Sequence, residues 1–240
     1  MNYNSSDILS GGAKNSVSVI LLAGGSGSRM LTPLPKQFLK LNKKPIALYS
    51  FEKFLQISDV TEIIVVCHEE YRYLFEVYEP KIPLKYALPG LRRQDSVFNG
   101  FKEIDSNANL VCIHDAARPF VTLEAIRDVI DTAMKMGASC VATPLKSTVK
   151  QADASKIVVQ TPDRSTLWEI QTPQAICPKL LARGFAVALE KDLTVTDDVS
   201  LVELLNLPVK LVLGSYTNIK VTTPEDLLFA EKIAECQAKV

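Results

Sequence analysis

A glycine-rich segment follows the first apolar stretch of the chain and has the composition of an anion-binding loop. Its sequence is Ala23-Gly24-Gly25-Ser26-Gly27-Ser28-Arg29-Met30. Three glycines within four positions let successive backbone N–H groups turn toward one concavity, which suits a phosphate chain. Arg29 and Lys36 add fixed positive charge, and Pro33 and Pro35 stiffen the connection between them. Taken alone, the segment is equally compatible with a glycine-rich turn that has solvated basic residues.

Two common phosphate-binding motifs do not match this segment. A P-loop requires Gly-Lys followed by Ser or Thr, and the dinucleotide fingerprint counted from Gly25 requires a small residue where Met30 stands. No acidic residue ends the second predicted strand, as ribose recognition by that fingerprint would require. A nicotinamide-dependent oxidoreductase is therefore only a remote alternative.

A single carboxylate follows the fourth predicted strand. Asp115 comes directly after the apolar run 110–114, and Arg118 follows it closely. Because the carboxyl ends of parallel strands meet at one edge of a sheet, we expect both residues near the glycine-rich segment. One carboxylate there is enough to hold Mg²⁺ whose other ligands are phosphate oxygens and water. For these two residues alone, a structural ion pair is an equal alternative.

A third cation, Lys220, precedes the last predicted helix. That helix begins at Thr223-Pro224, with a capping threonine, proline at the first helical position and acids in the first turn. The two histidines, His68 and His114, make no ligand cluster with the cysteines. Neither a structural zinc nor a histidine-based catalytic triad is therefore indicated.

The elements that must position these residues alternate between short β-branched segments and longer segments of helical period. In order, strand and helix in turn, they are 17–22, 46–57, 62–67, 69–79, 84–88, 94–104, 110–114 and 123–136. Later elements are a strand at 138–143, helices at 179–190 and 197–205, a strand at 209–213 and the closing helix. This alternation predicts an α/β fold with a mostly parallel sheet, residues 17–240 forming one domain after a polar extension at 1–16.

Residues 144–166 interrupt the alternation and predict an inserted β-hairpin arm. Two short β-branched stretches flank a polar turn, Gln151-Ala152-Asp153-Ala154-Ser155. A hairpin of this kind cannot bury its own apolar face, so it needs a packing partner. A second copy of the chain is the usual partner, and we expect a homodimer through the arm.

Composition excludes several broad classes of protein. The chain has 240 residues, 47% hydrophobic and 22% charged, which predicts a folded globular protein rather than a disordered one. Lys plus Arg and Asp plus Glu both number 27, so there is no basic excess to indicate a nucleic acid or an anionic membrane as partner. The five scattered cysteines favour a reducing compartment.

The polar start of the chain bears on location. No stretch is long and apolar enough to cross a bilayer, so we expect a cytoplasmic protein. The competing interpretation is a cleaved organellar transit segment at 1–16. The segment lacks arginine and contains Asp7, and both features argue against this interpretation.

Seven ordered motifs resemble the 2-C-methyl-D-erythritol 4-phosphate cytidylyltransferase family of the non-mevalonate isoprenoid pathway. They extend from about residue 17 to 235 and comprise residues 22–30, 35–38, 93–97, 114–119, 171–174, 196–198 and 218–222. The resemblance implies a Rossmann-like, three-layer nucleotidyltransferase fold. It also implies CTP and a polyol phosphate as substrates and Mg²⁺ as cofactor.

The resemblance further implies a role for each matched residue. It assigns catalytic roles to Arg29, Lys36 and Lys220 and triphosphate contacts to the glycine-rich segment at Ala23, Gly24, Gly25, Gly27 and Arg29. It assigns cytosine recognition to Gly90 and Ser96, and it assigns binding of the ribose and of Mg²⁺ to Asp115. The polyol phosphate falls to Arg118, Thr172 and Thr196, and Thr148 and Arg164 are residues that the arm lends to the neighbouring subunit.

Three positions depart from the family's usual pattern. Gly24 replaces an alanine, and Pro89 replaces the first glycine of a Gly-Gly pair. Leu91 stands where a polar residue often occurs.

Other functions compete with this one. The related pentitol-phosphate cytidylyltransferases, which use ribitol 5-phosphate, share the nucleotide motifs, so these residues do not separate the two acceptors. A non-catalytic nucleotide-binding protein of the same fold is a third alternative. The joint presence of Arg29, Lys36, Asp115 and Lys220 argues against it.

Overall fold

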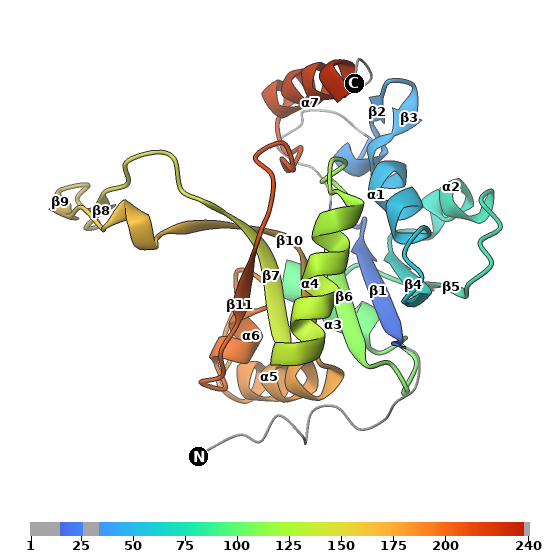
Figure 1. Ribbon diagram of the computed structural model, residues 1–240, viewed down its shortest axis with the longest axis horizontal. Coiled ribbons are helices and arrows are strands. Elements are labelled where there is room, and N and C mark those ends of the chain that lie inside the picture. Colours follow the sequence, from blue (N-terminus) through green and yellow to red (C-terminus); the bar gives the residue numbers. More distant parts are fainter. Residues whose placement is uncertain (1–14, 26–33, 238–240) are drawn as a thin grey trace.

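The computed structural model describes residues 15–25 and 34–237 (Figure 1). Its strands are β1 (Val17–Leu22), β2 (Lys40–Leu41), β3 (Lys44–Pro45), β4 (Val60–Val66), β5 (Leu84–Ala87), β6 (Leu110–Asp115), β7 (Ala138–Pro144), β8 (Gln151–Ala152), β9 (Val158–Gln160), β10 (Trp168–Ile176) and β11 (Lys210–Leu213). Its α-helices are α1 (Ile46–Phe54), α2 (Tyr73–Glu76), α3 (Arg93–Phe101), α4 (Leu123–Met136), α5 (Pro178–Glu190), α6 (Ser200–Glu203) and α7 (Pro224–Gln237).

The main sheet of the described residues has seven strands, in the order β11-β7-β10-β6-β1-β4-β5. β1 lies parallel between β4 and β6, and β5 extends the sheet in parallel beyond β4. The carboxyl ends of β1, β5 and β6 therefore lie at one edge. Gly24, Pro89 and Asp115 come to this edge from three distant parts of the sequence.

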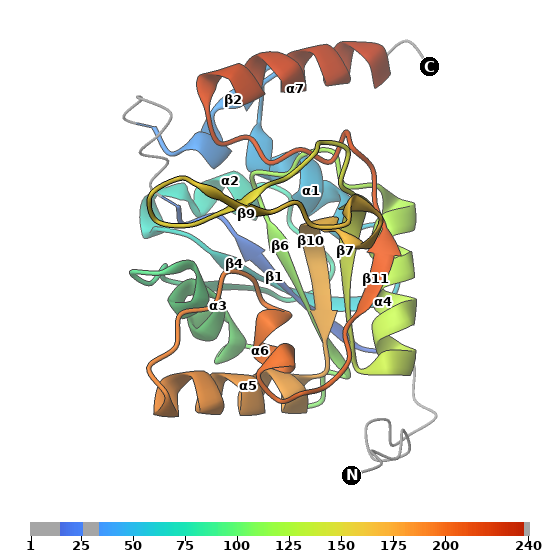
Figure 2. The ribbon, with the colours of Figure 1, turned by 90° about the vertical axis from the view of Figure 1, so that its left-hand side faces the viewer.

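Helices cover both faces of the sheet, which gives the three-layer α/β architecture (Figure 2). Alternate residues of β1 enter different cores, since side chains along a strand point to opposite faces. Leu21 packs with Phe51 of α1 and Ile126 of α4, whereas Ile20 packs with Leu181 of α5 on the other face. The predicted fold class is confirmed.

β10 runs antiparallel between β6 and β7, and it is not among the strands predicted from the sequence. Gln171, Pro173 and Gln174 interrupt its apolar pattern. Gln174 is nonetheless buried, because its Oε1 atom accepts the backbone N–H groups of Asp198 and Val199 at 2.9 and 3.0 Å. Long-range hydrogen bonds make this polar strand a central one, and periodicity cannot reveal them.

Two predicted helices are shorter than expected. The segment 69–79 contains a 3₁₀ turn at Glu69–Tyr71 and the short helix α2, since a 3₁₀ turn also places residues three apart on one face. The helix expected at 197–205 is reduced to α6. Other boundaries agree: Gly137 ends α4 with a φ of 84°, and α7 starts at Pro224.

The inserted hairpin is present as the antiparallel pair β8 and β9. We call residues 145–167 the arm; it leaves β7 and returns at β10, where Trp168 pairs with Pro144. It projects away from the rest of the molecule (Figure 1). Its tip exposes three apolar residues, Ile157, Val158 and Val159, which are 66, 54 and 61% exposed.

Candidate active site

Asp115 lies at the carboxyl end of β6 and meets cations from three parts of the chain. The Nζ atom of Lys220, from the connection between β11 and α7, lies 2.7 Å from Oδ2. Nε of Arg93, the first residue of α3, lies 3.2 Å from Oδ1. Nε of Arg118 lies 3.8 Å from Oδ2 and has no hydrogen-bond partner, although it is buried.

These cations determine the charge of the Asp115 side chain. Burial alone would raise its pKa, but Arg93, Lys220 and Arg118 together hold the pKa well below its usual range. The carboxylate therefore stays ionised, and it fixes three cations that would otherwise repel one another.

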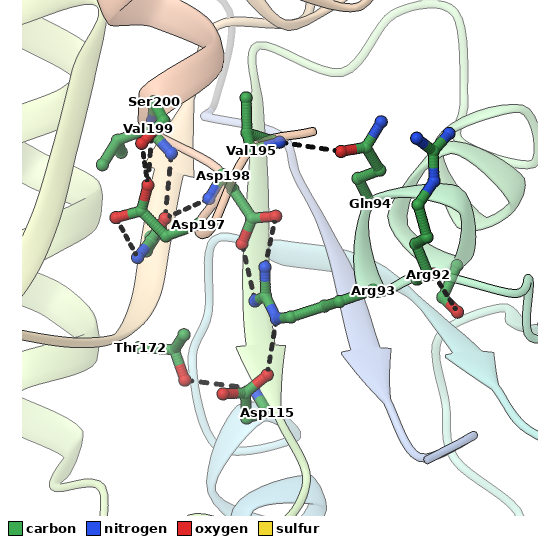
Figure 3. A network of polar contacts seen from close by, with 12 residues as sticks. Arg92, Arg93, Gln94, Asp115, Thr172, Val195, Asp197, Asp198, Val199 and Ser200 are labelled. Atoms are coloured by element: carbon green, nitrogen blue, oxygen red, sulfur yellow. Dashed lines mark hydrogen bonds and ion pairs between the residues drawn. The ribbon is translucent and has the colours of Figure 1, made fainter. Parts of the chain in front are cut away.

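Arg93 also joins α3 to the segment before α6. Its Nη1 and Nη2 atoms each donate to one carboxylate oxygen of Asp198 at 2.8 Å (Figure 3). Asp198 is only 2% exposed, so this bidentate pair is shielded from solvent. Neither residue is among the predicted site residues, though both lie in motifs that carry the family resemblance. The pair draws one predicted site segment, 196–198, toward Asp115.

A chain of hydrogen bonds fixes the backbone around Asp115. The backbone N–H of Asp115 donates to Oγ1 of Thr172 at 3.0 Å (Figure 3). Oγ1 of Thr172 lies 3.1 Å from Nδ1 of His114, whose Nε2 lies 3.2 Å from the carbonyl oxygen of Arg118. Burial lowers the pKa of His114 to about 3, so the ring is neutral near pH 7. Its Nε2–H then donates to the carbonyl of Arg118, and Nδ1 accepts from Thr172.

Asn218 clamps the segment that contains Lys220. Its Nδ2 atom donates to Oε1 of Gln171 at 2.9 Å and to the carbonyl oxygen of Thr172 at 3.0 Å. Its own carbonyl oxygen accepts from Nη1 of Arg118 at 2.8 Å. One buried asparagine thus connects β10, Arg118 and the Lys220 segment. Asn218 is not among the predicted site residues, although it stands in the motif 218–222.

Two adjoining cavities share Arg93, Asp115 and Lys220, which we call the shared wall. The larger has a volume of about 650 Å³ and is lined by Gly24, Gly25, Lys36, His68, Pro89, Gly90, Ser96 and other residues besides the shared wall. The smaller has a volume of about 280 Å³ and is lined by Arg118, Gln171, Thr172, Thr196, Asp197 and other residues besides the shared wall. The shared wall has two cations and one carboxylate, a composition that suits anions on both sides.

Gln37 holds the described part of the glycine-rich segment. Its buried Nε2 atom donates to the carbonyl oxygen of Ala23 at 2.6 Å and to that of Gly25 at 3.1 Å. Ala23 is itself buried and does not line the larger cavity. Two residues predicted for this segment, Gly27 and Arg29, lie outside the described residues.

The remaining predicted residues divide by cavity. Lys36, Gly90 and Ser96 line the larger one. Arg118, Thr172 and Thr196 line the smaller one, where the hydroxyl of Thr172 is already engaged with the backbone of Asp115. Thr148 and Arg164, both exposed on the arm, line neither. Nη1 of Arg164 donates to the carbonyl oxygen of Lys146 at 2.8 Å.

Asp115 is also the predicted metal ligand. Across residues 15–25 and 34–237, no group of three or more acidic, histidine or cysteine side chains could hold a metal ion. A single ionised carboxylate nevertheless fits magnesium, which commonly takes one or two protein oxygens and completes its shell with phosphates and water. The ion would share this carboxylate with Arg93 and Lys220, which already contact its oxygens.

Comparison with known proteins identifies the family. The model of the 2-C-methyl-D-erythritol 4-phosphate cytidylyltransferase family matches residues 17–235. The chain belongs to this family. Its members are nucleotidyltransferases, and the fold and the order of the motifs agree with that membership.

Relatives of this cytidylyltransferase family member come from plants and bacteria. The chloroplastic 2-C-methyl-D-erythritol 4-phosphate cytidylyltransferase of Oryza sativa subsp. japonica is 51% identical over 92% of this chain and 75% of its own length. The enzyme of the same name from Chlamydia pneumoniae is 41% identical over 90% of this chain and 98% of its own length.

A solved structure agrees with the family's fold. The 4-diphosphocytidyl-2C-methyl-D-erythritol synthase from Anaerococcus prevotii matches with a TM-score of 0.84 at 30% identity, covering 92% of this chain and 97% of its own. The part of this chain that the structure describes has no helix whose length and apolar character would let it cross a bilayer.

Proposed function

We propose that this chain joins CTP and 2-C-methyl-D-erythritol 4-phosphate to give CDP-methylerythritol and pyrophosphate. The observation that supports this most is the shared wall, because it borders two cavities that suit two anionic substrates. The larger cavity, beside the glycine-rich segment, would hold CTP. The smaller cavity would hold the phosphate of the acceptor near Arg118 and Thr196.

In the reaction, an oxygen of the acceptor phosphate attacks the α-phosphorus of CTP. A new P–O bond forms, the bond from the α-phosphorus to the bridging oxygen breaks, and pyrophosphate leaves with the bonding electrons. The nucleophile is already an anion, so the step requires no general base. Its main barrier is electrostatic, because two anions must approach and negative charge then develops on the leaving oxygens.

The cations at the edge of the sheet would lower that barrier by offsetting the negative charge. Lys36 and Lys220 both line the larger cavity, and Lys220 also faces the smaller one. Asp115 and Asn218 hold Lys220 in place before substrate arrives, which reduces the reorganisation needed in the transition state. Arg29, which would add a further charge, remains a proposal from the family pattern.

We also propose magnesium as the cofactor, with Asp115 as its protein ligand. When bound, the ion would neutralise part of the triphosphate charge and orient it. Lys220, which lines both cavities, would supply positive charge beside the ion.

A homodimer through the arm, in the cytoplasm, completes the proposal. The exposed Ile157, Val158 and Val159 give the arm an apolar tip that one chain leaves uncovered. Thr148 and Arg164 would then serve the site of the neighbouring subunit, in keeping with their absence from the lining of both cavities of their own chain. Light scattering that gives the mass of one chain at working concentration would contradict this.

The activity is tested by offering two acceptors in competition. The chain, CTP and Mg²⁺ are incubated with equal amounts of 2-C-methyl-D-erythritol 4-phosphate and ribitol 5-phosphate, and the products are separated by mass spectrometry. We expect CDP-methylerythritol to form in large excess. A predominant CDP-ribitol product would reassign the acceptor, and absence of both products despite CTP binding would contradict the enzymatic proposal.

A further inference from the structure

Gly24 and Pro89 lie against each other at the carboxyl edge of the sheet. Gly24 follows β1 and Pro89 follows β5, two strands that β4 separates. A Cβ atom built on Gly24 would lie 2.4 Å from Cβ and 2.9 Å from Cγ of Pro89. Both atoms belong to a ring that is fixed to its backbone, so they cannot rotate away as a flexible side chain would. Position 24 therefore has no room for a side chain while position 89 is proline.

The need for glycine at position 24 is steric rather than conformational. Among the described glycines, the left-handed backbone region is adopted by Gly137, and Gly24 is outside it. The neighbouring Gly25 provides a contrast, since a Cβ atom built there would meet no atom within 4 Å. The restriction at Gly24 thus comes from Pro89 and not from the general character of the glycine-rich segment.

The segment after Pro89 is held from its other side by α3. The backbone N–H of Gly90 donates to Oγ of Ser96 at 2.9 Å, and Asn99 donates to the carbonyl oxygen of Leu88 at 3.0 Å. A Cβ atom on Gly90 would lie 2.4 Å from Cβ of Asp95. Residues 88–90 are therefore confined between the end of β1 and the first turns of α3.

This confined segment forms one side of the larger cavity. Gly24, Pro89, Gly90 and Ser96 all line it. A shift of Pro89 would move Gly90, because the two residues are joined by one peptide bond. The contact of Pro89 with Gly24 consequently determines how far the Gly90 backbone reaches into the cavity.

We propose that Gly24 and Pro89 are a reciprocal positioning pair that sets the shape of the nucleotide-binding cavity. The inference rests on the proposed function for the identity of the nucleotide. Because a Cβ atom at position 24 would occupy the space of the Pro89 ring, the two positions share one space, and a larger residue at one requires a smaller residue at the other. Exchange of volume across one contact keeps the space filled and leaves the Gly90 backbone in place.

A double-mutant cycle tests this pair. Wild type, Gly24→Ala, Pro89→Gly and the double variant are compared for CTP binding by calorimetry and for the KM values of both substrates. Because the alanine methyl would overlap Pro89, we expect Gly24→Ala to weaken CTP binding by roughly tenfold or more. In the double variant the methyl occupies the space of the removed ring, and CTP affinity should return to within about threefold of wild type.

The outcomes separate positioning from a general loss of stability. The expected result is a raised KM for CTP in Gly24→Ala, reversed in the double variant, with the KM of the acceptor phosphate unchanged. Gly100→Ala is the matched control, because its Cβ atom would lie 2.7 Å from Cγ2 of Ile20 in the core, and Pro89→Gly should not rescue it. If Gly24→Ala does not fold, a double variant that folds and binds CTP would show that Pro89→Gly relieves the overlap at position 24.

The reciprocal pair would be overturned if each single substitution weakened CTP binding and the two losses of affinity multiplied in the double variant. So would a wild-type chain that does not bind CTP, since the cavity would then not be a nucleotide site. A wild-type chain that binds CTP without forming product would contradict the proposed reaction alone. The cycle in CTP affinity would still test the pair in that case.

Discussion

The Nζ atom of Lys220 lies 2.7 Å from Oδ2 of Asp115, so a lysine near the end of the chain meets the carboxyl end of the central strand β6. The contact is made at the boundary of two cavities. It keeps an ammonium group at the place where two phosphates would approach, and it does so before any substrate binds.

Replacing Lys220 by methionine should lower kcat by about 10²- to 10³-fold, since one preorganised charge contact in the transition state is lost. Steady-state kinetics with both substrates saturating would measure this. Lys210→Met is the matched control, because Lys210 is exposed on β11 and lines neither cavity. Turnover of Lys220→Met within threefold of wild type would remove Lys220 from the mechanism.

Replacing Lys36 by alanine should also lower kcat by about 10²-fold or more, with the thermal unfolding midpoint little changed. Lys36 lines the larger cavity beside Gly25, where the triphosphate would lie. Lys40→Ala, which removes an exposed lysine from the nearby strand β2, should leave kcat at the wild-type value. Near-normal turnover of Lys36→Ala would show that this side chain does not stabilise the transition state.

Replacing Asn218 by alanine should loosen the segment that contains Lys220. Two buried acceptors, on Gln171 and Thr172, lose their donor, which should reduce the free energy of unfolding by about 1–3 kcal/mol. We also expect kcat to fall and the KM of the acceptor phosphate to rise. A purely structural effect would lower the fraction of active enzyme and leave both KM values unchanged, so the KM values decide.

Acid should destabilise the fold partly through His114. Burial lowers its pKa to about 3, from an ordinary value near 6.5 in the unfolded chain. Between these values the unfolded chain binds more protons, so the free energy of unfolding should fall as the pH decreases from about 6.5 toward 3. The slope from this one group approaches ~1.4 kcal/mol per pH unit.

Urea unfolding in magnesium-free buffer at pH 7 and pH 4.5 would measure this effect. His114→Asn should lose less stability over the interval than wild type. His68→Gln, which removes the other histidine, should behave as wild type. An equal loss in wild type and His114→Asn would contradict the assignment.

Much of the site edge follows from the sequence, because strand alternation places the ends of β1, β5 and β6 together. Gly24, Lys36 and Asp115 could therefore be assigned to one region from the sequence. Their grouping required only that the strands run parallel, and the alternation of predicted strands and helices is enough to predict that.

The missed features are long-range polar contacts. Arg93 and Asp198 are 105 positions apart, and nothing in the local spacing of either residue indicates their ion pair. The central strand β10 escaped prediction for the same reason, since Gln171 and Gln174 are buried only because distant groups satisfy them. Such contacts become visible only when the topology is known.

If the shared wall brings an acceptor phosphate to the α-phosphorus of CTP, the acceptor must keep all of its phosphate oxygens. To test this, 2-C-methyl-D-erythritol 4-phosphate labelled with oxygen-18 in its phosphate group is supplied with CTP and Mg²⁺, and the label is located by mass spectrometry. We expect CDP-methylerythritol to retain all of the label, including the bridging oxygen, and pyrophosphate to have none. Label in pyrophosphate, or bound CTP with no diphosphate product, would contradict it.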